Sequence, residues 1–152
     1  MRDWLNHRFE NNSKDIFLQI KNKDFSYQEM GNIVYDRALA LYDLGVLPKQ
    51  KVGIFLSDPS DFIESYLSCY KIQATSVIFN TKWKEDELKR AIETVSIDFI
   101  ICSFSDKKLF TQFGKPIIFI EELSKSFGSC SPPKIKDQIN KNDIQSILFT
   151  SG

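Results

Sequence analysis

The chain has 152 residues, of which 42% are hydrophobic and 26% charged, a balance that allows one domain with its own core and argues against disorder. Twenty Lys and Arg residues offset twenty Asp and Glu residues, so the chain lacks the basic excess that a nucleic-acid surface requires. No apolar run approaches the length of a membrane span, and residues 1–8 carry charges where a signal peptide needs an apolar stretch, so we expect a cytoplasmic protein.

The first part of the chain predicts a small α+β segment. Residues 2–11 have the pattern of a short amphipathic helix, and residues 15–21 alternate in the manner of a strand. Phe25 then follows a polar turn. We expect this segment to precede the main sheet.

The best-marked helix of the chain comes next. Ser26 and Glu29 have the spacing of a capping box, in which each residue satisfies a backbone N–H group of the other. Gly45 supplies the signal for the C-terminal end of this helix. Apolar residues recur between these points at helical period: Tyr27, Met30, Val34, Ala38 and Leu41.

From Lys51 onward, apolar strands alternate with helices. Strands are expected over residues 52–56, 74–79, 99–102 and 117–120, and helices from Asp58 and Pro59, over 85–95 and over 106–113. Short apolar strands separated by helices are typical of a parallel sheet that is covered on both faces. The predicted fold class is therefore α/β and doubly wound, with a mostly parallel sheet and helices on both faces.

The end of the chain breaks this alternation. Residues 128–143 begin with small residues and prolines and continue with charged and amide residues, so they predict an exposed linker. Residues 1–127 would then form one α/β subdomain, and residues 144–152 a further strand and the start of a phosphate-binding loop. We expect a longer protein that continues this loop, because nothing after Gly152 holds it.

In open parallel sheets, ligands bind beyond the carboxyl ends of the strands. The predicted strand ends offer Ser57, Asp58, Asn80, Thr81, Ser103, Thr150, Ser151 and Gly152. The chain has neither the Gly-x-Gly-x-x-Gly pattern of dinucleotide-binding folds nor the Gly-x-x-x-x-Gly-Lys-Ser/Thr pattern of an ordinary P-loop. Another kind of phosphate site is needed to explain the terminal Thr-Ser-Gly.

Several of these residues have simpler structural interpretations. Asp58 could be the acceptor of a phospho-acceptor receiver domain, but an Asp before a proline is typical of a helix cap. Asn80 is expected to tie down a turn after its strand. Taken alone, Thr150, Ser151 and Gly152 fit an ordinary turn as well as a phosphate cradle, which two hydroxyls and a glycine would also suit.

The three cysteines are widely spaced, at Cys69, Cys102 and Cys130, and the single histidine is His7. This set predicts neither a zinc site nor a disulfide framework, so we expect reduced and partly buried thiols. Cys102 ends a predicted strand, where a nucleophile could sit, but no histidine is near it in sequence to activate it.

The order of several motifs resembles the adenylate-forming superfamily, which includes acyl-CoA synthetases, nonribosomal-peptide adenylation domains and luciferases. The motifs that carry the resemblance are Phe25–Met30, Leu44–Val46, Lys51–Leu56, Tyr70–Ala74, Phe79–Lys82 and Ile147–Gly152. They extend over essentially the whole chain. The stretch from Ile78 to Lys82 is most similar to the o-succinylbenzoate–CoA ligases.

The resemblance implies a two-step ligase that uses ATP, Mg²⁺ and coenzyme A. A carboxylic acid attacks the α-phosphate of ATP to give an acyl-adenylate and pyrophosphate, and a thiol then displaces AMP. The family's Thr/Ser/Gly-rich loop holds the β- and γ-phosphates, which assigns phosphate contacts to Thr150, Ser151 and Gly152. The catalytic lysine and the acyl pocket would lie beyond Gly152, so no catalytic residue and no metal ligand is assigned, and the chain alone is expected to be inactive.

Two departures from the family pattern indicate a divergent member. Gln73 stands where the family usually has glycine, and Ile78 where proline is frequent. The acyl substrate therefore stays open, as does the choice between coenzyme A and a carrier-protein thiol. An alternative from another class is a non-catalytic α/β binding or regulatory module on the same scaffold.

Overall fold

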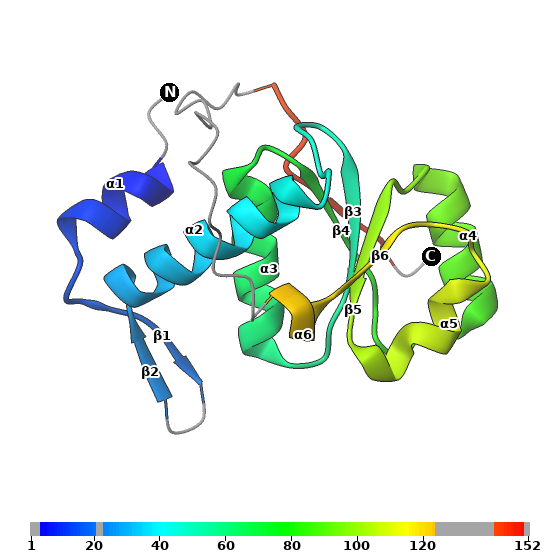
Figure 1. Ribbon diagram of the computed structural model, residues 1–152, viewed down its shortest axis with the longest axis horizontal. Helices are drawn as coiled ribbons and strands as arrows, with labels where there is room; N and C mark the ends of the chain where they lie inside the picture. Colours follow the sequence, from blue (N-terminus) through cyan, green and yellow to red (C-terminus); the bar gives the residue numbers. More distant parts are fainter. Residues whose placement is uncertain (1–3, 21–22, 124–141, 151–152) are drawn as a thin grey trace.

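The computed structural model describes residues 4–20, 23–123 and 142–150, and its elements follow one another as Figure 1 shows. A small hairpin pairs β1 with β2 in antiparallel fashion, and five parallel strands form the main sheet in the order β6-β5-β3-β4-β7. The elements are α1 (Trp4–Asn11), β1 (Ile16–Ile20), β2 (Lys23–Ser26), α2 (Tyr27–Asp43), β3 (Lys51–Phe55), α3 (Pro59–Lys71), β4 (Thr75–Ile78), α4 (Glu85–Val95), β5 (Phe99–Cys102), the 3₁₀ helix η1 (Phe104–Asp106), α5 (Lys107–Thr111), β6 (Ile117–Phe119), α6 (Ile120–Leu123) and β7 (Ser146–Leu148).

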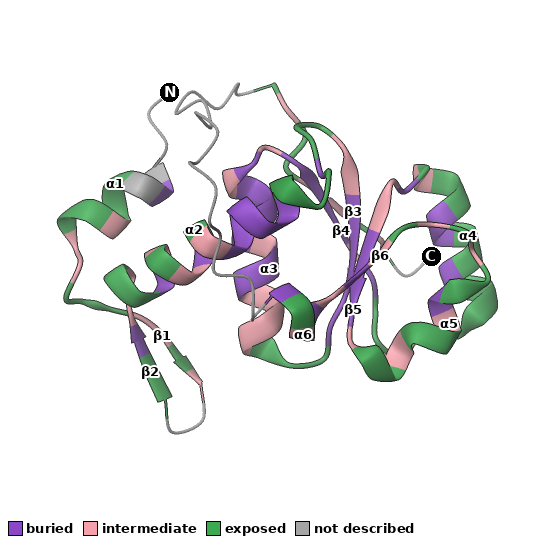
Figure 2. Cartoon of the chain, viewed as in Figure 1, coloured by how far each residue is buried: buried purple, intermediate pink, exposed green. Residues whose placement is uncertain are grey.

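Both faces of the main sheet are covered, which confirms the predicted doubly wound α/β class. Successive residues of β3 point to opposite faces. Val52 and Ile54 pack in a core with α2, α3 and α6, whereas Phe55 packs in a second core with α4 and α5. Figure 2 shows the buried residues concentrated in the strands and in the helix sides that face them.

A small α+β segment precedes the main sheet, as predicted, and it contains one more strand than expected and packs against α2. Phe25 belongs to β2, a strand of polar composition that exists because it pairs with β1. The ring of Phe17 lies 5.1 Å from that of Tyr27 and 6.1 Å from that of Phe9, which ties the hairpin to α1 and α2. Two short elements, η1 and α6, were also absent from the prediction, and α6 starts at Ile120, where a strand end was expected.

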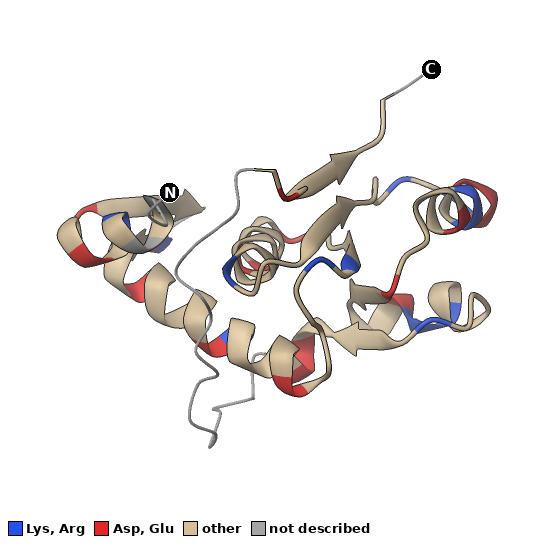
Figure 3. Ribbon diagram, turned by 90° about the horizontal axis from the view of Figure 1, so that it is seen from above, with Lys and Arg blue, Asp and Glu red and all other residues tan. Residues whose placement is uncertain are grey.

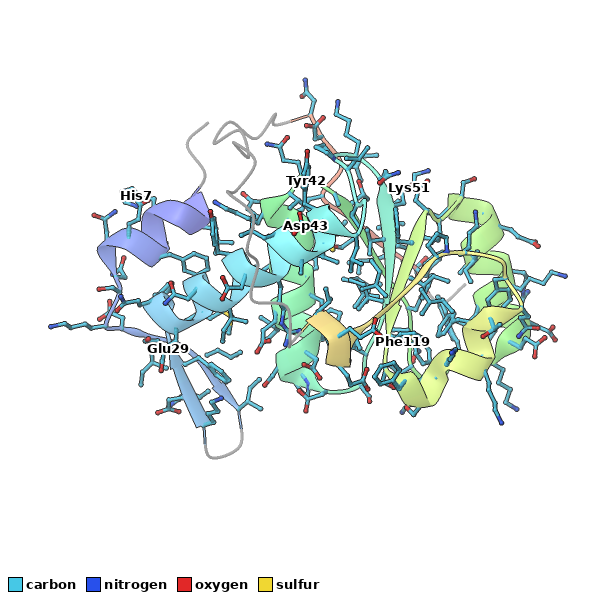
Figure 4. All side chains as sticks on the ribbon, in the orientation of Figure 1. His7, Glu29, Tyr42, Asp43, Lys51 and Phe119 are labelled. Carbon is cyan, nitrogen blue, oxygen red and sulfur yellow. The ribbon has the colours of Figure 1, made fainter. Side chains whose placement is uncertain are left out.

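The predicted helix starts are confirmed in atomic detail. At α2, the Glu29 carboxylate accepts from the Ser26 N–H at 2.8 Å, and the Ser26 hydroxyl accepts from the Glu29 N–H at 3.2 Å. Glu29 is labelled in Figure 4. These hydrogen bonds, that of the Ser26 backbone first, lower the pKa of the Glu29 carboxyl below its ordinary value. At α3, the Asp58 carboxylate accepts from the N–H groups of Ser60 and Asp61.

Gln73, which stands where the family usually has glycine, adopts a backbone conformation that favours glycine. After α3, the Ala74 N–H donates to the Cys69 carbonyl at 2.9 Å, and Gln73 adopts a left-handed conformation with φ of 61°. This geometry is that of a Schellman motif, whose left-handed position suits glycine. After α2, Gly45 takes the corresponding place with φ of 93°. Gln73 therefore occupies a position where a Cβ atom costs free energy.

We predict that Gln73→Gly is more stable than Gln73→Ala by about 1 kcal/mol, because a Cβ is unfavourable in the left-handed region. Comparing the two variants with each other removes the effect of losing the Gln73 side chain, which both share. Urea unfolding monitored by circular dichroism measures the difference. An alanine variant at least as stable as the glycine variant would contradict the prediction.

A buried ionic group joins α2 to α3. The Arg37 Nη2 atom lies 2.5 Å from Glu64 Oε2 and 3.3 Å from Asp61 Oδ1. The side chains of Arg37 and Glu64 are only 9% and 7% exposed. Burial raises the pKa of Glu64, Arg37 opposes that shift, and Asp61 adds to it. The ionised carboxylate is therefore held between the two helices mainly by one guanidinium.

We predict that Arg37→Met lowers the free energy of unfolding at pH 7 by about 3 kcal/mol, because it leaves Glu64 buried without its counter-ion. A raised pKa in the folded state means that the folded protein binds the proton more tightly, so protonation favours folding. The deficit relative to wild type should shrink as the pH falls from 7 toward 4.5, the ordinary pKa of a glutamate.

Urea unfolding at a series of pH values tests this, with Arg8→Met as a control that removes the same charge from an exposed position of α1. The control should lose little stability at any pH. A deficit of Arg37→Met that does not change with pH would argue against an uncompensated carboxylate.

Candidate functional site

The carboxyl ends of the parallel strands open into two separate hollows. The acidic hollow, of about 160 Å³, lies at the ends of β3, β5 and β6 and is lined by Leu56, Ser57, Asp58, Asp61, Ser103, Asp106, Ile120 and Glu121. The aromatic groove, of about 770 Å³, lies at the ends of β4 and β7 and is lined by Ile78, Phe79, Asn80, Trp83, Glu87, Arg90, Ala91, Thr94, Leu148, Phe149 and Thr150. The predicted strand-end residues are thus divided: Ser57, Asp58 and Ser103 share the first hollow, Asn80 and Thr150 share the second, and Thr81 lines neither.

The acidic hollow is poorly suited to a phosphate. Its carboxylates repel an anion, and several are already engaged in the fold. Asp58 caps α3, Asp106 accepts from the Ser103 hydroxyl at 2.8 Å, and Glu121 accepts from the Phe104 N–H at 3.0 Å. Among the described residues, no group of three or more His, Cys, Asp or Glu side chains is arranged to hold a metal ion. The helix-cap interpretation of Asp58 is confirmed.

The cysteines in the described ranges are buried thiols. Cys102 at the end of β5 is fully buried, and burial, with Asp106 and Glu121 adding to it, raises its pKa to about 12. Burial also raises the pKa of Cys69 to about 12, although a hydrogen bond with Ser76 opposes the shift. A buried, protonated thiol is a poor nucleophile, so the structure gives the catalytic interpretation of Cys102 no support. Cys130 lies outside the described residues.

The aromatic groove receives the strand that precedes the predicted phosphate contacts. β7 pairs in parallel with β4, with Ile147 opposite Val77. Thr150 follows two residues after the last strand residue and is exposed at the rim of the groove. Ser151 and Gly152, the other two predicted phosphate contacts, lie outside the described residues.

Asn80 forms the turn at the end of β4, as predicted. Its side-chain oxygen accepts from the Lys82 N–H, and its backbone oxygen accepts from the Trp83 N–H, each at 2.9 Å. This turn carries the chain from β4 to the groove wall formed by α4. The wall contributes Arg90 and Thr94, which the sequence did not mark because they are separated from Thr150 by more than one element of the fold.

The charges around the two hollows differ in balance. The groove contains one basic and one acidic side chain, Arg90 and Glu87, whereas the acidic hollow contains four carboxylates and no basic residue in its lining. Figure 3 shows that Lys and Arg residues and Asp and Glu residues are otherwise interspersed over the described helices and loops. An anionic ligand is therefore better accommodated at the groove.

Comparison with known proteins decides the family. The family model described as AMP-binding enzyme matches residues 5–152. The chain belongs to the AMP-binding enzyme family. The adenylate-forming resemblance of the sequence motifs is thereby confirmed.

The similar proteins differ in size and in activity. The AMB antimetabolite synthetase AmbB of Pseudomonas aeruginosa is 21% identical over 155 residues, which cover 99% of this chain and 12% of that protein. The o-succinylbenzoate coenzyme A synthetase MenE of Bacillus subtilis, solved with AMP, superposes with a TM-score of 0.91 at 20% identity, over 100% of this chain and 39% of that one. The N-terminal subdomain structure of NpsA from Klebsiella oxytoca, solved with 3-hydroxyanthranilyl-AMSN, gives 0.86 at 16% identity, over 99% of this chain and 37% of that one.

At these identities the solved structures show a shared fold. This chain spans well under half the length of each of these relatives. The chain has the fold of the N-terminal part of adenylate-forming enzymes. No helix in the described ranges is long and apolar enough to cross a bilayer.

Proposed function

We propose that this chain is the N-terminal part of an ATP-dependent, AMP-forming carboxylate–CoA ligase of the cytoplasm. The observation that carries the proposal is the position of Thr150. This exposed residue follows the parallel strand β7 at the carboxyl edge of the sheet, on the rim of an open groove. Membership of the AMP-binding enzyme family supports ATP as the nucleotide substrate. Residues 1–127 would serve as the scaffold, 128–143 as a linker, and 144–152 as the strand and start of the phosphate loop.

In this proposal, Thr150, Ser151 and Gly152 contact the ATP phosphates. Hydroxyl and backbone N–H groups donate hydrogen bonds to phosphate oxygens, and glycine permits close backbone approach. Mg²⁺ would be bound through the phosphates of ATP, because this ion is commonly held by substrate phosphates together with a few carboxylates and waters. One structural relative was solved with ATP and a magnesium ion, the MenE enzyme of Bacillus subtilis, with a TM-score of 0.80 over 86% of this chain.

The reaction would proceed in two steps on the longer protein. The carboxylate oxygen of the substrate bonds to the α-phosphorus of ATP, and pyrophosphate leaves. The sulfur of the acceptor thiol then bonds to the acyl carbon, and AMP leaves with the electron pair of the broken bond. The motif from Ile78 to Lys82 supports coenzyme A as the acceptor. A carrier-protein thiol is the alternative, supported by the likeness to NpsA, which was also solved as a fusion of an adenylation domain with a PCP domain.

We predict that the full-length protein catalyses ATP–pyrophosphate exchange with one member of a carboxylic-acid panel and that Thr150→Val raises its KM for ATP about tenfold. The estimate corresponds to loss of one hydrogen bond to a charged group. Thr111→Val is the matched control, because Thr111 is exposed on α5 and lines neither of the two hollows. Its KM should stay within about twofold of wild type.

Mass spectrometry of the product then distinguishes the acceptors, with coenzyme A and a phosphopantetheinylated carrier protein offered separately. Absence of exchange with every acid would favour the non-catalytic module. Equal effects of the two threonine variants would remove the phosphate contact from Thr150 without removing the ligase assignment. Sequencing the gene beyond codon 152 gives an independent check: a continuation such as Ser/Thr-Thr-Gly-x-Pro-Lys favours the ligase, and a stop codon favours the non-catalytic module.

A further inference from the structure

The edge strand β7 is anchored at its beginning by polar contacts. The Thr75 hydroxyl donates to the Ile144 carbonyl at 2.7 Å, and the Ser76 N–H donates to the Gln145 carbonyl at 2.9 Å. Just before the strand, the Asp143 carboxylate lies 3.2 Å from the Lys49 ammonium. The pairing with β4 then ends at Leu148.

Directly after the last paired residue, the chain is held by contacts between aromatic rings. Leu148 is 69% exposed, whereas Phe149 is half-buried and turned toward the core beneath α4. The ring of Phe149 lies 5.1 Å from that of Trp83 in an edge-to-face contact and 6.4 Å from that of Phe79 in a stacked contact. We call Phe79, Trp83 and Phe149 the aromatic clamp. It holds the residue immediately before Thr150.

Two other features of the chain fix the positions of the Phe79 and Trp83 rings in the clamp. Gly53 of β3 lies under the ring of Phe79, and a Cβ atom at position 53 would overlap that ring. The Asn80 turn directs Trp83 back over the end of β7, where its ring also lies 6.3 Å from that of Phe79. The clamp therefore joins the segment after β4, which carries Phe79 and Trp83, to Phe149 directly after β7, and Gly53 of β3 leaves room for the Phe79 ring.

We propose that Trp83 and Phe149 are positioning residues that fix where the phosphate contacts begin. This inference rests on the proposed function. In the described residues the pairing of β7 with β4 ends at Leu148, so a small rotation at Phe149 would move Thr150 away from its place. Misplacement of a binding group by about 1 Å can cost up to about a hundredfold in rate, which makes such an anchor consequential. In this proposal both rings act on ATP binding through the position of Thr150.

The test uses the full-length protein with Phe149→Leu and Trp83→Leu, and Phe119→Leu as the matched control. Phe119 is half-buried at the end of β6, the opposite edge strand, and its ring packs 4.5 Å from that of Phe104; it is labelled in Figure 4. The KM for ATP in ATP–pyrophosphate exchange and the melting temperature are measured for each. We expect KM to rise about tenfold for both clamp variants and by less than about twofold for Phe119→Leu, at similar losses of melting temperature.

A conservative variant distinguishes a role of the Phe149 ring in positioning Thr150 from a general contribution to packing. Phe149→Tyr keeps the ring and should keep the wild-type KM. Clamp variants that raise KM no more than Phe119→Leu does, at a comparable loss of melting temperature, would overturn the proposal. The same holds if Phe149→Tyr is as impaired as Phe149→Leu.

A second measurement does not depend on activity. Hydrogen–deuterium exchange, followed by mass spectrometry over residues 146–150, should be faster in Phe149→Leu than in wild type and unchanged in Phe119→Leu. If the wild-type protein shows no ATP–pyrophosphate exchange, the proposed function fails, while faster hydrogen exchange would still support the clamp as the anchor of β7. Unchanged hydrogen exchange in Phe149→Leu overturns the anchor itself.

Discussion

The structure depends on the need of a parallel sheet to bury both of its faces. β3 lies at the centre of the sheet, and its side chains alternate between the core under α2, α3 and α6 and the core under α4 and α5. Burying apolar surface on both sides contributes about 25 cal/mol per Å², the dominant favourable contribution to folding. The central strands accordingly have few polar positions, and polar chemistry is confined to the ends of the strands and to the loops that follow.

Local signals in the sequence predicted most of the fold. The capping pairs at α2 and α3 involve residues two or three positions apart, so Ser26, Glu29 and Asp58 could be recognised without tertiary information. The hairpin strand β2 could not, because its polar sequence becomes a strand only by pairing with β1. The contact of Arg37 with Glu64 was likewise invisible, since it depends on how two helices pack.

The site was predictable in part and by a different route. Resemblance to a family marked Thr150, Ser151 and Gly152, and the structure describes only the first of them. The division of the strand ends into an acidic hollow and an aromatic groove follows from strand order, which places β7 beside β4 and far from β6. Trp83 and Phe149 were missed because their contact joins a turn after β4 to the end of β7, although the inward alternation of Ile147 and Phe149 could have indicated a packed ring.

The glycine at the centre of the sheet has a consequence for how this sequence can vary. The Phe79 ring occupies the volume that a side chain at position 53 would take. The two positions are therefore coupled, because a larger residue at 53 requires a smaller one at 79. A smaller residue at 79 would in turn remove the ring that packs against Phe149. Among sequences of this fold, positions 53 and 79 should accordingly change together and conserve their combined volume.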